Sequence, residues 1–406
     1  MQKIRIIKNE KYYFIFTIIL FLFLPFFSIL FQLFFISVFN LNRKYFIRLL
    51  IITISLYIGL INATKLPETD LEVYLSWYQT AGELPLGQFL FKTSKAEPLF
   101  DVLTYILNFL FRGSEFLYIL FLTFIIYNFF LRAVYKFYNY YKSEGYIIVL
   151  AIVLASFLPQ LFSVSSNIIR QLLASSLIFY FLINRIFYKK NYWIILVISI
   201  FTHTSVSFLL PFVFIDLFVK SFKLKKMLGF LILAIPITSL LINFYKSIFN
   251  FLINFLSFPF LAYAFLRILK PSRDILYEPP GVKVVILVLL LLMFILYHVI
   301  LNIKGVIVSK PYVYFSIVYL GFVLVFFATF NLTEISHRLL YYTYYFIPFI
   351  FPALIVKKNT ILNRLVSSGV ILFVLMYFII KLDTSVWTYA PKIHLFGDLL
   401  LYHFYQ

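Results

Sequence analysis

Cysteine is absent from the chain, and acidic residues are scarce. The lack of cysteine excludes disulfides, thiolate nucleophiles and cysteine metal sites. Only 15 acidic residues stand against 35 basic ones. The sequence has five scattered histidines and no Asp-x-Asp pair, so we expect neither a metal centre nor a cofactor.

Hydrophobic residues take the place of the missing charge. They make up 63% of the chain, and the mean hydropathy is +0.99. Repeated apolar runs are long enough to cross the ~30 Å hydrocarbon layer of a bilayer. The sequence therefore predicts an all-α, polytopic bundle of about 10–13 membrane segments, folded as one integral membrane domain over residues 1–406, and excludes a soluble fold.

The formal net charge of +20 could indicate a nucleic-acid partner. However, lysine and arginine cluster in short gaps beside apolar runs, which is typical of loops that face anionic lipid. We therefore expect the lipid bilayer, and no nucleic acid, as the partner of this charge.

Three apolar segments have basic flanks or polar interruptions that indicate breaks. Residues 12–39 contain Pro25, residues 99–131 contain a polar break at 112–115, and residues 192–219 contain a polar break at 202–205. We interpret each as a hairpin, a re-entrant piece or a broken crossing. The basic N-terminus followed by a long apolar run predicts a retained anchor rather than a cleaved signal.

Counting basic flanks places several polar segments on the outer side of the membrane. These are an external loop at 63–96, an amphipathic helix and loop at 248–283, and the C-terminal tail at 381–406. The same count places Arg170 in the first turn of a helix that starts at the outer surface, and Arg338 near that surface.

A few polar or ionisable residues lie at or inside the edges of apolar segments, where they are costly unless a substrate or a partner uses them. They are Asp70, Glu72, Arg170, Gln171, His203 and Arg338.

Ordered motifs around these residues resemble the EpsG family of Wzy-type exopolysaccharide, capsule and O-antigen polymerases. The motifs are Asp70-Leu71-Glu72-Val73-Tyr74, then Glu97-Pro98-Leu99-Phe100, then Ile169-Arg170-Gln171-Leu172-Leu173-Ala174, then His203-Thr204-Ser205, and finally Ser336-His337-Arg338 before an aromatic run at 341–345.

The resemblance implies a GT-C-like fold in the bacterial cytoplasmic membrane, with an active site that faces the periplasm or outside. It implies transfer of a growing glycan from undecaprenyl diphosphate to a sugar hydroxyl of a lipid-linked repeat unit, without a metal and with inversion. The implied partner is the undecaprenyl-diphosphate-linked oligosaccharide, and a chain-length regulator and a flippase are further candidate partners.

A lipid diphosphate leaving group favours arginine, whose planar fork matches phosphate oxygens and keeps its charge. Arg170 and Arg338 are the main candidates, with Arg267, Lys270 and Arg273 as additions and Gln171 beside them. At the start of a helix, Arg170 would also lie beside backbone N–H groups that attract anions. The alternative is that Arg170 only extends to the membrane interface.

A carboxylate near the attacking hydroxyl could accept its proton. Asp70 is the first candidate and Glu72 the second. On a helix, Asp70 shares a face with Tyr74, and Trp77 lies nearby, which suits stacking on sugars. The alternative for Asp70 is a helix N-cap.

Glu97 and His203 are open to structural interpretations as well. Glu97 before Pro98 is a candidate substrate contact, but it also suits the start of a helix. His203 at a break is a candidate catalytic group or a buried histidine bonded to Thr202 or Ser205. The aromatic run at 341–345 favours packing over glycan binding.

Other functions remain open on the sequence alone. One is a GT-C-type glycosyltransferase that adds a single sugar from a polyprenyl phosphate donor. Another is a transporter or flippase of lipid-linked glycans, although we find no internal repeat. A membrane acyltransferase fits the basic outer cluster less well.

Overall fold

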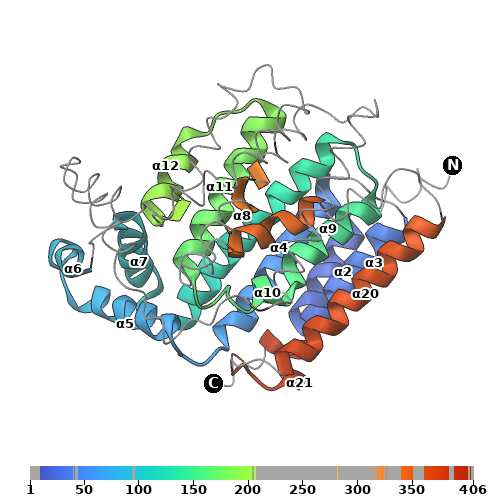
Figure 1. The fold of residues 1–406 in the computed structure, drawn as a ribbon. Helices are drawn as coiled ribbons and strands as arrows, with labels where there is room; N and C mark the ends of the chain where they lie inside the picture. The colour runs from blue at the N-terminus through green and yellow to red at the C-terminus, as the bar shows by residue number, and fades with distance from the viewer. Residues whose placement is uncertain are drawn as a thin grey trace, which may run out of the picture.

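Apolar runs of the sequence become helices in the computed structural model, and the described part contains helices and no strands (Figure 1). The structure describes residues 10–39, 41, 44–93, 97–203, 205–206, 281, 315, 318–319, 321–323, 326, 340–350, 361–383, 388–400 and 403. The main elements are α2 (Glu10–Phe23), α3 (Pro25–Val38), α4 (Lys44–Ala63), α5 (Asp70–Glu83), α6 (Leu86–Thr93), α7 (Pro98–Phe111), α8 (Glu115–Tyr140), α9 (Gly145–Phe157), α10 (Pro159–Phe162), α11 (Ile169–Tyr188), α12 (Trp193–Thr202), α20 (Ile361–Asp383) and α21 (Lys392–Phe396).

Helices α2 and α3 form the hairpin predicted at Pro25. Pro25 opens α3, where its missing N–H costs nothing. The Ser28 hydroxyl donates to the carbonyl of Thr17 at 2.9 Å, and the rings of Tyr13 and Phe35 stack at 4.9 Å. An earlier residue of α2 thus pairs with a later residue of α3, so the two helices run antiparallel.

The break predicted at residues 112–115 is confirmed. Arg112 ends α7 in the left-handed conformation (φ 51°), and Gly113 follows at φ 79°. Ser114 then caps α8, because its hydroxyl accepts a hydrogen bond from the N–H of Leu117 at 3.4 Å. The chain therefore reverses in three residues, and α7 and α8 pack against each other.

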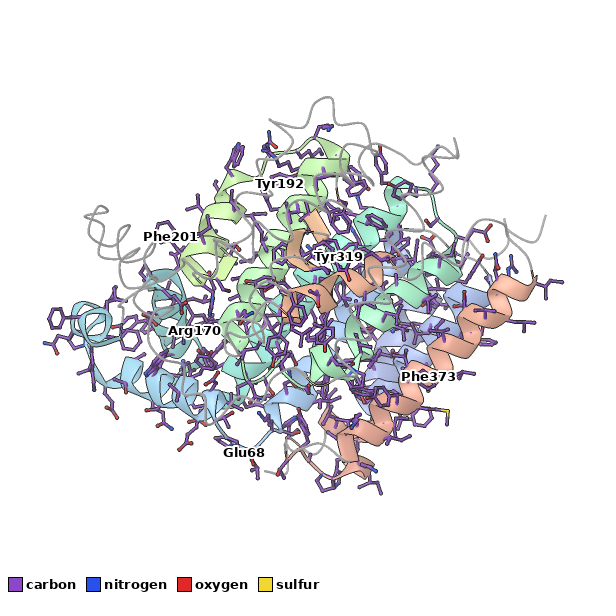
Figure 2. The ribbon with its side chains drawn as sticks, viewed as in Figure 1. Glu68, Arg170, Tyr192, Phe201, Tyr319 and Phe373 are labelled. Atoms are coloured by element: carbon purple, nitrogen blue, oxygen red, sulfur yellow. The ribbon has the colours of Figure 1, made fainter. Side chains whose placement is uncertain are left out.

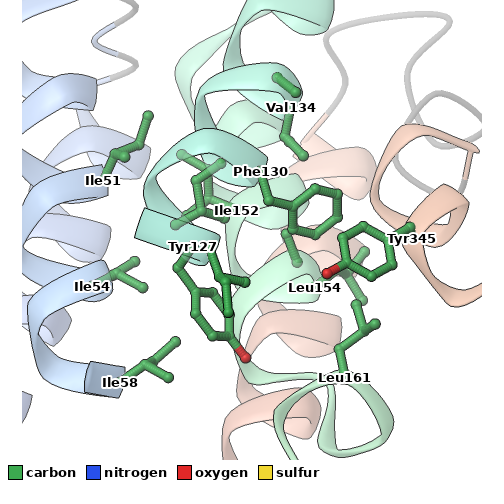
Figure 3. Packing of buried hydrophobic residues seen from close by; sticks show 14 of the residues in the cluster. Ile51, Ile54, Ile58, Tyr127, Phe130, Val134, Ile152, Leu154, Leu161 and Tyr345 are labelled. Carbon is green, nitrogen blue, oxygen red and sulfur yellow. The ribbon is translucent and has the colours of Figure 1, made fainter. Parts of the chain in front are cut away.

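The core is built on α4, α8 and α11. Helices α4 and α8 lie close together at Gly59, where an added Cβ would lie 2.9 Å from the carbonyl oxygen of Leu120. Figure 3 shows Ile54 and Ile58 of α4 on the side of Tyr127 of α8, while the ring of Phe130 on α8 lies beside Tyr345. Helix α9 is buried along its whole length. Helix α20 packs against α9 and exposes Phe373 at its surface (Figure 2).

Within the described residues, four helices are long and apolar enough to cross a membrane. They are Lys44–Ala63, Glu115–Tyr140, Ile169–Tyr188 and Asn363–Leu382, and four shorter apolar helices accompany them. A 20-residue helix such as α11 spans about 30 Å. The prediction of an all-helical, polytopic membrane protein is confirmed.

Two of the three predicted external segments fall in the described part. Within residues 63–96 the chain forms α5 and α6, which lie with α7 at one edge of the molecule (Figure 1). The C-terminal tail packs on the linker before α5, since the N–H of Leu66 donates to the carbonyl of Thr388 at 3.0 Å. The 248–283 segment, apart from Gly281, lies outside the described residues. The side of the membrane that each segment faces stays a prediction.

Candidate active site

Arg170 lies in the first turn of α11, as predicted from the sequence (Figure 2). A turn over residues 163–168 precedes it, and Ile168, at the N-cap, gives no side-chain cap. The Arg170 side chain is 17% exposed and leaves α11 toward α5 and α7. Its guanidinium group is therefore partly buried and still reachable from outside.

Glu97 is the ionic partner of Arg170. The distance from Arg170 Nη1 to Glu97 Oε2 is 2.6 Å, and the carboxylate is only 4% exposed. Pro98 takes the first position of α7, as predicted, but Glu97 makes no side-chain cap bond to that helix. The carboxylate therefore serves a contact between helices rather than the start of its own helix.

Aromatic rings enclose the other sides of the guanidinium group. Arg170 Cζ lies 5.2 Å from the ring centroid of Tyr74, 4.9 Å from Trp77 and 5.8 Å from Phe100. Arg170 Nε also donates to the hydroxyl of Tyr74 at 3.5 Å. Burial raises the pKa of Tyr74, so its hydroxyl stays protonated. Stacking on rings holds the guanidinium plane while leaving its edge for hydrogen bonds.

Some N–H donors of Arg170 are not used by the described residues. A guanidinium group carries five N–H donors, and those that Arg170 directs at the described residues go to Glu97 and Tyr74. The remaining N–H groups have no acceptor in the part of the chain that the structure describes. Such a group is suited to a ligand that brings several oxygens.

His203 meets the same carboxylate from the other side. It lies at the end of α12 with extended backbone, and its Nε2 is 3.6 Å from Glu97 Oε1. The N–H of Ser205 donates to His203 Nδ1 at 3.1 Å, so a neutral ring carries its proton on Nε2 and points it at Glu97. The contact with Ser205 was expected of a buried histidine, whereas the contact with Glu97 was not.

Asp70 and Glu72 lie in the first turn of α5 and are exposed. Thr69, not Asp70, occupies the N-cap position, so the N-cap interpretation of Asp70 is wrong. Tyr74, one turn on, is buried against Arg170. Among the described residues, no ion pair joins Asp70 or Glu72 to Arg170, so both face the surface beside the enclosed site.

Some of the other predicted residues lie in the described part of the chain and some do not. Gln171 is buried within α11, with 2% exposure, and its backbone carbonyl accepts a hydrogen bond from the Ser175 hydroxyl. Arg338, Arg267, Lys270 and Arg273 lie outside the described residues. The aromatic run at 341–345 packs between helices, as predicted, with Tyr345 against Phe130. Tyr342 also shares a 2.7 Å hydrogen bond with Ser205, which places the run near His203.

Sequence reasoning missed Asp101. It lies one turn after Glu97 on α7, is 3% exposed, and is close enough to Arg170 to interact electrostatically. Two carboxylates four residues apart at the head of an apolar helix share one face. That spacing was the signal available in the sequence.

Lys65 lies in the predicted external loop at 63–96, yet it is only 4% exposed. Its amine donates to the Asn167 side chain in the turn before Arg170, and the Thr69 hydroxyl donates to the same Asn167 oxygen at 3.4 Å. Burial lowers the pKa of Lys65 to about 8, although Glu68 and Asp70 act in the opposite direction. The linker before α5 is thereby tied to the turn that presents Arg170.

Apolar helices surrounding a partly buried arginine, two buried carboxylates and a histidine define a polytopic membrane protein with an ionic site at one end of its bundle. The chain belongs to the EpsG family, whose family model matches residues 44–390. No curated protein and no solved structure matches the chain.

Proposed function

We propose that this protein is a polysaccharide polymerase of the cytoplasmic membrane. It would transfer a growing glycan from undecaprenyl diphosphate to a sugar hydroxyl of a lipid-linked repeat unit. Membership of the EpsG family supports a polysaccharide-related membrane function. The observation that carries the finer proposal is Arg170, which is held by aromatic rings and Glu97 while keeping N–H donors for another anion.

In this proposal, Arg170 binds oxygens of the diphosphate. The guanidinium fork matches phosphate oxygens, and the first turn of α11 adds backbone N–H groups and the positive end of the helix dipole. As the bond between the anomeric carbon and the diphosphate oxygen breaks, the leaving lipid diphosphate takes the electron pair. Arg170 stabilises the charge that develops there.

The acceptor hydroxyl would form the new bond to the anomeric carbon and lose its proton to a carboxylate. Asp70 is exposed at the head of α5, one turn from Tyr74, and so lies where an incoming sugar can reach it. In neutral His203 the Nε2 proton faces Glu97, so this ring acts as a donor in the arrangement seen. We therefore assign the proton transfer to Asp70.

The test is to incubate purified protein in liposomes with its lipid-diphosphate repeat unit, with and without EDTA, and to resolve the products by gel and mass spectrometry. We expect a ladder spaced by whole repeat units that survives EDTA. A single added sugar would instead indicate the GT-C-type glycosyltransferase. Lipid-linked glycan that crosses the membrane without covalent change would indicate a transporter.

A further inference from the structure

Among the described residues, Glu97 lies between Arg170 and His203 and contacts them unequally. Its Oε2 lies 2.6 Å from Arg170, a full charge-assisted hydrogen bond, while its Oε1 lies 3.6 Å from His203 Nε2. The two oxygens of one carboxylate thus connect α11 to the end of α12. A small shift of this side chain would strengthen one contact at the expense of the other.

Access to the two partners of the ion pair also differs. The Arg170 side chain is 17% exposed, whereas the Glu97 side chain is 4% exposed. An anion arriving from outside therefore meets the guanidinium group first and finds its Nη1 already engaged by Glu97. A diphosphate offers several oxygens to one guanidinium group, so it can bind the N–H groups that Arg170 does not direct at Glu97 and can also compete with the carboxylate for Nη1.

Electrostatics adds to this competition. A diphosphate bound to Arg170 would bring its negative charges close to Glu97 and to Asp101, both buried at the head of α7. Like charges in a poorly solvated site oppose each other strongly. His203 is the described group placed to take over the Glu97 carboxylate, because its Nε2 already faces Oε1.

We propose that Glu97 is a positioning residue that limits how tightly Arg170 holds the diphosphate, and that His203 receives the carboxylate when the diphosphate is bound. This inference rests on the proposed function. After transfer, the lipid diphosphate is a product that must leave, and Glu97 speeds its departure by recapturing Arg170. Glu97 thereby weakens binding of the diphosphate and raises the turnover rate.

The first experiment measures binding of farnesyl diphosphate to the full chain in detergent by calorimetry. Glu97→Gln removes the competing charge and should bind about tenfold more tightly than wild type. Arg170→Lys should bind at least tenfold more weakly. Glu83→Gln, an exposed carboxylate at the end of α5, is the matched control and should equal wild type.

The second experiment tests the role of His203 by a double-mutant cycle. His203→Gln alone should weaken binding several-fold, because Glu97 then stays on Arg170. In the Glu97→Gln background the same change should have little effect. A histidine with only a structural role would weaken binding equally in both backgrounds, and that result would overturn the proposal.

Kinetics provide a third measurement. With Glu97→Gln, a single round of transfer should proceed at a rate near that of wild type, while the steady-state rate falls because product release slows. If this variant folds poorly, Glu97→Asp replaces it, since the shorter side chain withdraws the carboxylate from Arg170 and should also tighten binding.

The outcomes separate this proposal from the function on which it rests. If wild type and Arg170→Lys bind farnesyl diphosphate equally, Arg170 is not the diphosphate site and both are overturned. If binding depends on Arg170 but neither Glu97 variant tightens it, the proposed function stands and the competition by Glu97 is overturned.

Discussion

The side-chain amide of Asn62 donates a hydrogen bond to the Ser165 hydroxyl at 2.7 Å, which joins the end of α4 to the turn before Arg170. Ser165 in turn donates to the carbonyl of Phe162 at 2.7 Å. Asn62 and Ser165 are both fully buried. The turn that presents the arginine is therefore held from beneath by a polar contact inside an apolar bundle.

Replacing Asn62 with alanine should destabilise the protein. The change leaves the buried Ser165 hydroxyl without this donor and opens space beside Thr123, at a cost of roughly 1–3 kcal/mol. Thermal unfolding in detergent measures the loss. Gln88→Ala on the exposed face of α6 is the control and should leave the melting temperature unchanged; an equal melting temperature for Asn62→Ala would contradict the prediction.

Arg170→Lys should impair glycan transfer by at least about tenfold although the positive charge remains. A lysine cannot present a planar fork to a diphosphate, nor can it match the contacts of the guanidinium group with the rings of Tyr74 and Trp77. The rate of ladder formation in liposomes is the measurement. Arg132→Lys, exposed on α8, serves as the control, and near-normal polymer from Arg170→Lys would rule out its assigned role.

Asp70→Asn should abolish most of the transfer without loss of expression. Asp70 is exposed in the first turn of α5, so we expect the fold to depend little on its charge. The measurement pairs the polymer yield with the amount of protein in the membrane. Glu83→Gln on the same helix is the control, and an unchanged polymer yield from Asp70→Asn would remove this residue from the mechanism.

Lys65 predicts a specific dependence of stability on pH. Its pKa falls to about 8 in the folded protein, from an ordinary value of 10.5. Between these two values the unfolded chain binds more protons than the folded one, so stability should rise as the pH increases from 8 to 10.5. Lys65→Met should flatten this part of the profile, as measured by thermal unfolding across the range. An identical slope in the variant would show that another group is responsible.

Two glycines give a matched pair for helix packing. A Cβ on Gly59 would lie 2.9 Å from the backbone oxygen of Leu120, so Gly59→Ala should force α4 away from α8 and lower the melting temperature. Gly87 on α6 has open space around it, so Gly87→Ala should be neutral or stabilising by up to about 1 kcal/mol through helix propensity. Equal effects of the two changes would contradict the close packing.

Much of the fold could be predicted because its signals are local. Pro25, the Arg112-Gly113 turn and the polar stretch before Ile169 each end or begin a helix through backbone preferences within a few residues. The membrane class follows from composition in the same way. Which side faces outward depends on the bilayer and not on contacts within the chain, so the topology stays a prediction.

The site could be predicted only in part, because its contacts span long separations. Arg170, Glu97 and His203 were named one by one, but their meeting joins the starts of α7 and α11 to the end of α12. Asp101 escaped notice because its four-residue spacing from Glu97 does not by itself show that both carboxylates meet an arginine on another helix. Lys65 escaped because burial by a distant turn is invisible in the sequence around it.

The contacts of the C-terminal tail also bear on how the protein is made. The Tyr57 hydroxyl donates to the carbonyl of Leu395, which is 338 residues later in the chain, and the N–H of Ala390 donates to the Thr64 hydroxyl. The ribosome must therefore synthesise and release this late segment before the linker that leads to α5 can gain all of its contacts. A nascent chain that ends before residue 388 could already join Lys65 to Asn167 but would lack the contacts of the tail, so the end of the bundle that carries Arg170 is completed last.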